Sequence, residues 1–140
     1  MSKHLILMGL CAVIMTGCKR ELTVKQTVPV KGKVVFANGE PVRWAQLNLL
    51  TKDPNVGANC MANVKGDGTF EVRTYSASEY DGAVPGVYDV QIETYNFVAS
   101  GPLPPNASSP TPVPKDASNG VTVEIKADGD NQNIEIKLTK

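Results

Sequence analysis

The sequence predicts an all-β protein, a seven-stranded sandwich of two sheets that follows an apolar N-terminal leader. Three observations lead to this prediction. Seven segments alternate apolar and polar residues with a period of two, which is typical of strands with one buried face. Glycine-containing turn sequences separate most of these segments. No stretch after the leader shows a helical period, so the segments are expected to pack as two sheets.

The leader comprises residues 1–17 and starts with Lys3 and His4. The apolar run that follows, 5–15, has about 11 residues, whereas a membrane-spanning helix needs about 20. It therefore fits the hydrophobic region of a secretory signal peptide. The leader ends in Met15-Thr16-Gly17-Cys18, which resembles the lipobox of bacterial lipoproteins. This resemblance implies cleavage before Cys18 and attachment of lipid to its thiol.

An ordinary secretory signal with an incidental cysteine is the alternative interpretation of the leader. Lipidation is favoured because Cys18 directly follows the apolar run and precedes the polar residues Lys19-Arg20-Glu21. Stable anchoring takes two or more acyl chains, and the resemblance implies three. Lys19, in place of an aspartate, implies the outer membrane. The predicted location is the bacterial cell envelope, on its periplasmic or surface face, with the lipid bilayer as a partner.

The mature chain is predicted to have two parts. Residues 18–27 form the lipidated cysteine and a polar tether, and residues 28–140 form the domain. The predicted strands of the domain are, in order, residues 28–36, 45–50, 60–64, 69–74, 87–95, 121–125 and 134–138.

Alternation and turn residues justify the first four strands. Asn38-Gly39 predicts a turn with positive φ after the first strand, and Gly66-Asp67-Gly68 predicts a tight hairpin between the third and the fourth. The segment 60–64 alternates more weakly than the others. The residues expected to face the core are Val30, Gly32, Val34, Phe36, Ala45, Leu47, Leu49, Phe70 and Val72.

The last three strands follow the same pattern. Pro85-Gly86 predicts a turn before the fifth strand, and Asp128-Gly129-Asp130-Asn131 predicts one between the sixth and the seventh. Residues 97–118 contain six prolines, so they are predicted to form a long, partly polyproline loop between the fifth and sixth strands. The residues expected to face the core are Tyr88, Val90, Ile92, Val121, Val123, Ile125, Ile134, Ile136 and Leu138.

The order of these motifs resembles the carboxypeptidase regulatory-like domains, which have a transthyretin-like (prealbumin-like) fold. The matching segments cover roughly residues 28–138. The resemblance implies a Greek-key sandwich and no particular activity. The motifs that carry it are Val30-Lys31-Gly32-Lys33-Val34, Asn38-Gly39-Glu40-Pro41-Val42, Gly66-Asp67-Gly68-Thr69-Phe70 and Pro85-Gly86-Val87-Tyr88-Asp89-Val90.

Composition disfavours several functions. The 14 basic and 14 acidic residues balance, which argues against a nucleic-acid partner. His4 is the single histidine and lies in the leader, so the mature chain lacks the histidine of Ser-His-Asp, Cys-His and common zinc sites. The chain also ends without the Tyr-Arg-Gly-Ser motif of the hydrolase known on the transthyretin-like fold. No cofactor or metal is predicted, and Asp128 and Asp130 are expected to be turn residues rather than calcium ligands.

The expected function is a membrane-anchored, non-catalytic structural or binding module. Its ligand is not identified by the sequence, and the partners considered are an envelope protein and a polysaccharide. The alternatives are a carrier of a small ligand and a hydrolase on a transthyretin-like fold. An enzyme of unknown type would rely on carboxylates such as Glu79, Asp81 and Asp116. Cys60 is expected to be a small buried side chain. Trp44 either contacts a ligand or covers one end of the sandwich. The candidate binding residues are Trp44, Tyr75, Tyr80 and Tyr95.

Overall fold

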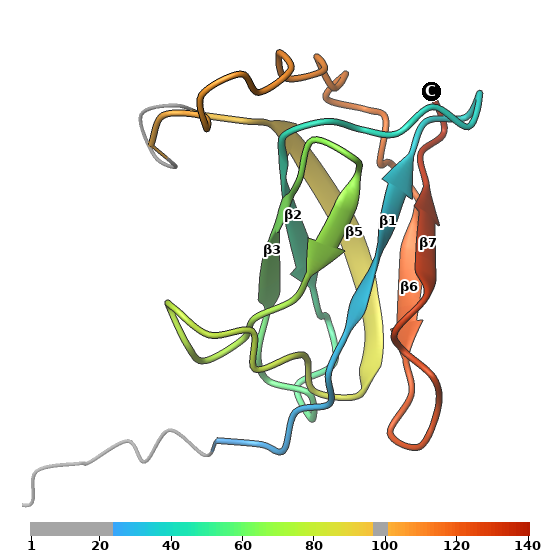
Figure 1. Ribbon diagram of the computed structural model, residues 1–140. Coiled ribbons are helices and arrows are strands. Elements are labelled where there is room, and N and C mark those ends of the chain that lie inside the picture. The colour runs from blue at the N-terminus through green and yellow to red at the C-terminus, as the bar shows by residue number, and fades with distance from the viewer. Residues whose placement is uncertain (1–23, 97–100) are drawn as a thin grey trace, which may run out of the picture.

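The computed structural model describes residues 24–96 and 101–140, so the predicted leader, Cys18 and the first residues of the tether lie outside the described part (Figure 1). The described residues form seven strands and no helix. The strands are β1 (Lys31–Val35), β2 (Ala45–Leu50), β3 (Cys60–Val64), β4 (Thr69–Glu71), β5 (Gly86–Thr94), β6 (Thr122–Ile125) and β7 (Ile134–Lys137).

The strands make two sheets that pack face to face. One sheet has the order β4-β1-β7 and the other has the order β3-β2-β5-β6. β1 and β7 run parallel, and every other neighbouring pair is antiparallel. The prediction of an all-β, sandwich-type fold is confirmed.

The core lies between the sheets and contains the side chains that the alternation placed there. Tyr88, Phe70 and Leu47 are the largest side chains that are fully buried. Phe36, Val121, Val123 and Ile134 are partly buried against this core. The completely buried members, all at 0–1% exposure, are Val34, Val42, Ala45, Leu47, Leu49, Ala62, Val64, Phe70, Val72, Ala83, Tyr88 and Ala117.

Two turns, residues 36–40 and 65–69, have the same geometry. In each, the first N–H donates to the fifth carbonyl at 2.8 Å, and the fourth N–H donates back to the first carbonyl. The fourth residue is a glycine with positive φ, 88° at Gly39 and 85° at Gly68. The Asn or Asp at the third position accepts the N–H of the fifth residue at 3.0 Å. Both turns predicted from Asn-Gly and Gly-Asp-Gly are therefore present.

The hairpin between β3 and β4 joins the two sheets, because its strands belong to different ones. Beyond the turn, Met61 and Arg73 exchange two backbone hydrogen bonds of 2.9 Å, but β4 pairs with β1. The predicted strand 69–74 thus ends early, at Glu71. After Glu71 the chain leaves β1, because Arg73 pairs with Met61 of β3. From Thr74 onward the backbone N–H groups bind the Asp81 carboxylate instead of a neighbouring strand.

β6 and β7 are consecutive along the chain but lie in different sheets. The connection between them is organised by Asn131, which is only 5% exposed. Its side-chain amide accepts the N–H of Lys126 at 3.1 Å and donates to the Lys126 carbonyl at 2.8 Å. Its backbone carbonyl accepts the N–H of Lys31 at 2.9 Å, which places the start of β7 beside β1.

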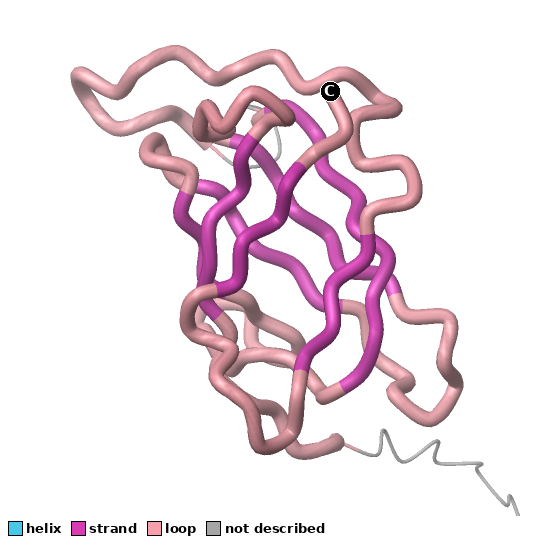
Figure 2. The backbone as a smooth tube through the Cα atoms, turned by 90° about the vertical axis from the view of Figure 1, so that its right-hand side faces the viewer, coloured by secondary structure: helices cyan, strands magenta, loops and turns pink. Residues whose placement is uncertain are grey.

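The loops gather at the two ends of the sandwich (Figure 2). The end where the described chain begins, called the N-terminal end below, carries residues 24–30, 72–85 and 126–133 (Figure 1). The opposite end, called the distal end, carries both glycine turns and the proline-rich segment that starts at Gly101.

Hydrogen bonds of its backbone N–H groups and carbonyls hold the proline-rich segment across the distal end. The N–H of Thr111 donates to the Arg43 carbonyl at 2.9 Å, and the N–H of Val113 donates to the Thr94 hydroxyl at 2.9 Å. Farther along, the N–H of Thr139 donates to the Ala117 carbonyl at 2.8 Å. The described part of the predicted loop, 101–118, therefore contains no strand but is fixed to both sheets.

Candidate functional site

The four aromatic side chains proposed as binding residues lie at opposite ends of the sandwich. Trp44 and Tyr95 meet at the distal end, where their ring centroids are 6.5 Å apart in an edge-to-face arrangement of 75°. Tyr75 and Tyr80 lie in the 72–85 segment at the N-terminal end. The four residues therefore do not form one continuous patch: Trp44 and Tyr95 are in contact, and Tyr75 and Tyr80 lie at the other end.

Trp44 packs against the distal end as a cover. Its backbone is left-handed, with φ of 53°, which is unusual for a large side chain. The half-buried indole lies on Gly66, where a Cβ would come within 3.0 Å of the ring. Its Nε1 is buried without a hydrogen-bond partner among the described residues. The backbone N–H of Trp44 donates to the Lys65 carbonyl at 3.3 Å. This bond places Trp44 beside the 65–69 turn, and its ring covers the turn at Gly66.

Tyr75 and Tyr80 are exposed, at 43% and 53%. The Tyr75 hydroxyl accepts the backbone N–H of Lys25 at 3.1 Å. This bond attaches the segment that leads toward the N-terminus to the 72–85 segment. A second link lies close by, because Val28 and Ala83 exchange two backbone hydrogen bonds of 2.8 and 3.0 Å.

Asp81 fixes the conformation of the segment that presents these tyrosines. Its carboxylate accepts the backbone N–H groups of Thr74, Tyr75 and Ser76 at 2.7, 2.8 and 3.1 Å. Burial opposes ionisation of Asp81, but the three N–H donors outweigh it and hold the pKa of the carboxyl below its ordinary value. The role of Asp81 in the structure is thus to hold a loop.

Replacing Asp81 with asparagine is expected to lower stability by about 1 kcal/mol at pH 7, because a neutral amide accepts these bonds less strongly. Because the folded-state pKa is depressed, the stabilisation is present above the unfolded-state pKa of about 3.9 and disappears as pH falls through the folded-state value. Urea unfolding followed by Trp44 fluorescence should therefore show a difference at pH 7 that shrinks at pH 3. The control is Glu79→Gln on the same segment. An equal loss of stability at pH 7 and pH 3 would contradict the role of the ionised Asp81 carboxylate in holding the segment.

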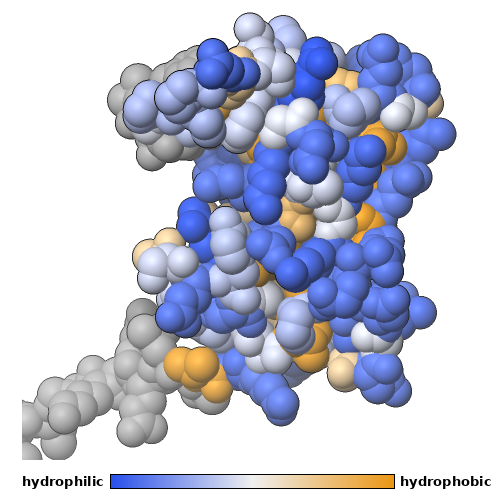
Figure 3. All heavy atoms as spheres, in the orientation of Figure 1, coloured by the Kyte–Doolittle hydropathy of each residue, from blue (hydrophilic) through white to orange (hydrophobic). Residues whose placement is uncertain are grey.

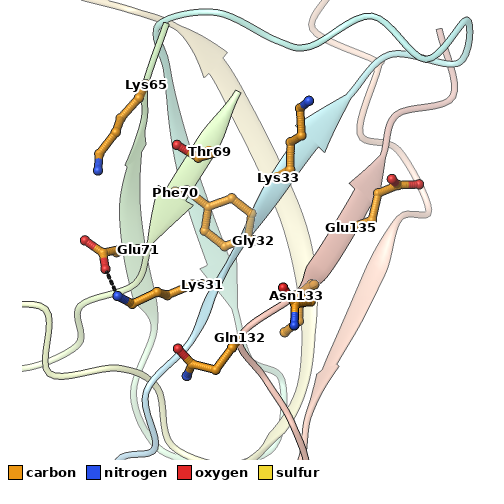
Figure 4. Close-up of a pocket in the computed structure, with 11 residues that line it drawn as sticks. Lys31, Gly32, Lys33, Lys65, Thr69, Phe70, Glu71, Gln132, Asn133 and Glu135 are labelled. Carbon is orange, nitrogen blue, oxygen red and sulfur yellow. Dashed lines mark ion pairs between the residues drawn. The ribbon is translucent and has the colours of Figure 1, made fainter. Parts of the chain in front are cut away.

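A shallow hollow lies on the outer face of the β4-β1-β7 sheet (Figure 4). Lys31 forms an ion pair with Glu71, and the hydrogen bond from its ammonium group lowers the pKa of the Glu71 carboxyl. Lys33 lies between Thr69 and Glu135 on the neighbouring strands. Figure 4 shows the Lys33 and Lys65 side chains directed away from each other. The alternating charges resemble an ordinary solvated sheet face more than a site for one anion.

Two of the three carboxylates considered for catalysis, Asp81 and Asp116, have structural partners, and Glu79 lies in the same segment as Asp81. Asp116 pairs with the Lys140 ammonium group near the end of the chain, whereas Asp81 holds the 72–85 segment. Asp130 accepts the N–H of Gln132 at 2.9 Å, as expected of a turn residue. Within residues 24–96 and 101–140, no group of three His, Cys, Asp or Glu side chains could hold a metal ion.

Cys60 is 3% exposed and has a free thiol, as the sequence predicted. Burial raises its pKa, although the neighbouring hydroxyls of Thr74 and Tyr88 partly offset this effect. The thiol is therefore a packed core group and a poor nucleophile.

Comparison with known proteins gives no match: no family model, no curated protein and no solved structure resembles this chain closely enough to be identified. In the part of the chain that the structure describes, no helix is long and apolar enough to cross a bilayer. The fold defines the class of protein as an all-β sandwich domain. The function is argued below from the residues.

Sequence reasoning missed part of the exposed apolar surface. Val24, Met61 and Val87 are 69%, 39% and 57% exposed. A signal was present for two of them, because Met61 and Val87 occupy the outward phase of the alternation in β3 and β5. The loop-holding role of Asp81 had no such signal, since its partners lie five to seven residues away in an irregular segment.

Proposed function

We propose that this chain is a lipid-anchored, non-catalytic module of the bacterial envelope, with a carboxypeptidase regulatory-like domain of the transthyretin-like fold. The observation that carries the proposal is the Met15-Thr16-Gly17-Cys18 sequence at the end of an apolar leader. A cysteine thiol is the strong nucleophile that lipid transfer requires, and small residues suit cleavage just before it. The bilayer is then the first partner of the protein.

The strand order supports the finer proposal about the fold. The two sheets, β4-β1-β7 and β3-β2-β5-β6, contain one parallel pair, and the consecutive strands β3 and β4 lie in different sheets. Chain crossings of this kind are typical of Greek-key sandwiches. The glycine turns and the Pro85-Gly86-Val87-Tyr88 motif occupy positions that the resemblance implies.

A binding role is supported over catalysis because two of the candidate catalytic carboxylates have structural roles. Asp81 holds a loop and Asp116 forms an ion pair with Lys140. The exposed side chains of the domain remain as contact surfaces for a partner such as an envelope protein or a polysaccharide. Crosslinking in intact envelopes, followed by mass spectrometry, would identify such a partner.

Replacing Cys18 with serine is expected to remove the protein from the membrane fraction, because no thiol remains to carry acyl chains. Cys11→Ser is the matched control, since Cys11 lies inside the leader and should leave anchoring unchanged. Fractionation and the intact mass of the mature protein are the measurements. If Cys18→Ser stays in the membrane and its mature form has the parent's mass apart from the change of cysteine to serine, Cys18 is not the anchor. The leader then has another role.

A further inference from the structure

We propose that the N-terminal end of the sandwich is a membrane-contact surface at which Tyr75, Tyr80 and Val24 rest against the lipid. This inference rests on the proposed acylation of Cys18 and adds which face of the domain meets the bilayer. Three observations carry it: the length of chain before Val24, the distribution of exposed apolar side chains, and the hydrogen bonds that hold Tyr75 and the 72–85 segment in place.

The chain between the anchor and the domain is short. Six residue steps separate Cys18 from Val24, and a fully extended chain spans at most about 3.6 Å per residue, or about 20 Å here. By comparison, β5 alone has nine residues, which corresponds to about 30 Å along the sandwich. Acyl chains on Cys18 therefore keep the N-terminal end near the lipid surface, with the distal end about a strand length farther away.

The exposed large apolar side chains gather at this same end. Val24 begins the described chain, Tyr75 and Tyr80 lie in the 72–85 segment, and Met61 and Val87 are near the first residues of β3 and β5. These five are all of the large apolar residues classed as exposed in the described part of the chain. Figure 3 shows one small, strongly hydrophobic spot beside the point where the described chain begins.

Tyr75 is held in position before any contact forms, and Tyr80 lies in the same segment, directly before Asp81. Asp81 fixes the backbone around Tyr75 through three N–H bonds, and Tyr75 in turn binds the Lys25 N–H. The same residues therefore connect the 72–85 segment to the chain that leads toward Cys18. Tyrosine rings have an apolar body and a polar hydroxyl, which suits the boundary between lipid headgroups and acyl chains.

The distal end provides the contrast. Its aromatic residues are partly covered, because Trp44 packs on Gly66 and the Tyr95 hydroxyl donates to the Gly101 carbonyl at 3.0 Å. The proline-rich segment crosses this end and is fixed to Arg43 and Thr94. Trp44 is the single tryptophan of the chain, so it reports on the end predicted to stay away from lipid.

Tryptophan fluorescence of the mature, acylated protein in phosphatidylcholine vesicles with brominated acyl chains tests the proposal. The variant Tyr80→Trp adds a reporter at the N-terminal end, and Val24→Trp is a second variant there. The matched control is Ala37→Trp, an exposed position in the distal 36–40 turn. Emission from Tyr80→Trp and Val24→Trp should be blue-shifted and partly lost to bromine quenching. Emission from the parent protein and from Ala37→Trp should change little.

Equal quenching in Tyr80→Trp, Val24→Trp and Ala37→Trp, with all three sedimenting with the vesicles, would overturn the contact surface but leave the anchor standing. Absence of acyl mass on Cys18 would instead refute the proposed function, and with it this inference. The sedimentation and mass measurements thus separate the two failures.

Discussion

Replacing Gly32 with alanine is expected to destabilise the domain by about 3 kcal/mol or more, at the upper end of what overpacking a core costs. A Cβ at this position would overlap the Ile134 carbonyl oxygen and lie 2.7 Å from the Phe70 ring. Neither neighbour can move cheaply. Ile134 belongs to β7, which pairs with β1 at this point, and Phe70 is 1% exposed. The added methyl group would therefore force β1 away from β7 or displace the largest ring of this sheet.

Equilibrium urea unfolding of the mature domain, followed by circular dichroism at the strand band, measures this loss. Lys33→Ala is the matched control, because the neighbouring side chain points outward from the same strand and should change stability by less than about 0.5 kcal/mol. A Gly32→Ala midpoint within error of the Lys33→Ala midpoint would show that the close approach of β1, β7 and Phe70 is not as described.

Replacing Tyr88 with alanine is expected to cost about 3–5 kcal/mol, as for other large aromatic residues of protein cores. Tyr88 is 0% exposed, and its hydroxyl donates to the Val84 carbonyl at 2.6 Å. This bond from a tyrosine to the backbone four residues earlier is a tyrosine corner. It explains the Pro85-Gly86-Val87-Tyr88 motif, because the turn must bring the Val84 carbonyl back over the start of β5.

Comparison of Tyr88→Phe with Tyr88→Ala separates the hydroxyl from the ring. The phenylalanine variant keeps the ring and loses the bond, so it should cost only about 1 kcal/mol. Burial is the main reason that the pKa of Tyr88 is raised, so the hydroxyl stays protonated and the loss should not vary between pH 6 and 8. Thermal unfolding of both variants measures these differences. Similar losses in the two variants would mean that the ring contributes little to the core.

Period-two alternation predicted the strands well because burial of one face acts on each residue locally. β2 and β3 have the predicted bounds, and the glycine turns at Gly39 and Gly68 are where Asn-Gly and Asp-Gly placed them. The fourth strand was predicted three residues too long. Val72 does face the core, but the chain then passes from β1 to a single bridge between Arg73 and Met61. From Thr74 the backbone binds the Asp81 carboxylate, which gives no local signal.

The candidate aromatic residues were predicted as residue types and not as a site. The spacing of these residues along the chain does not predict that Trp44 and Tyr95 are in contact. Nor does it predict that Tyr75 and Tyr80 lie at the N-terminal end of the sandwich. That arrangement depends on the register of β2 against β5, which pairs Ala45 with Thr94. Register follows from packing of both sheets at once, so it is not contained in any single segment.

By itself, the sequence determined that this chain is all-β, which faces of its strands are buried and where its glycine turns lie, because these follow from local periodicity and backbone sterics. Only the tertiary structure decided which strands pair. It set β7 parallel to β1, divided four consecutive strand pairs between the sheets and gathered the exposed apolar residues at one end. Those outcomes depend on contacts between residues distant in the chain, such as Gly32 with Ile134. Such contacts contribute to stability only when the whole core is assembled.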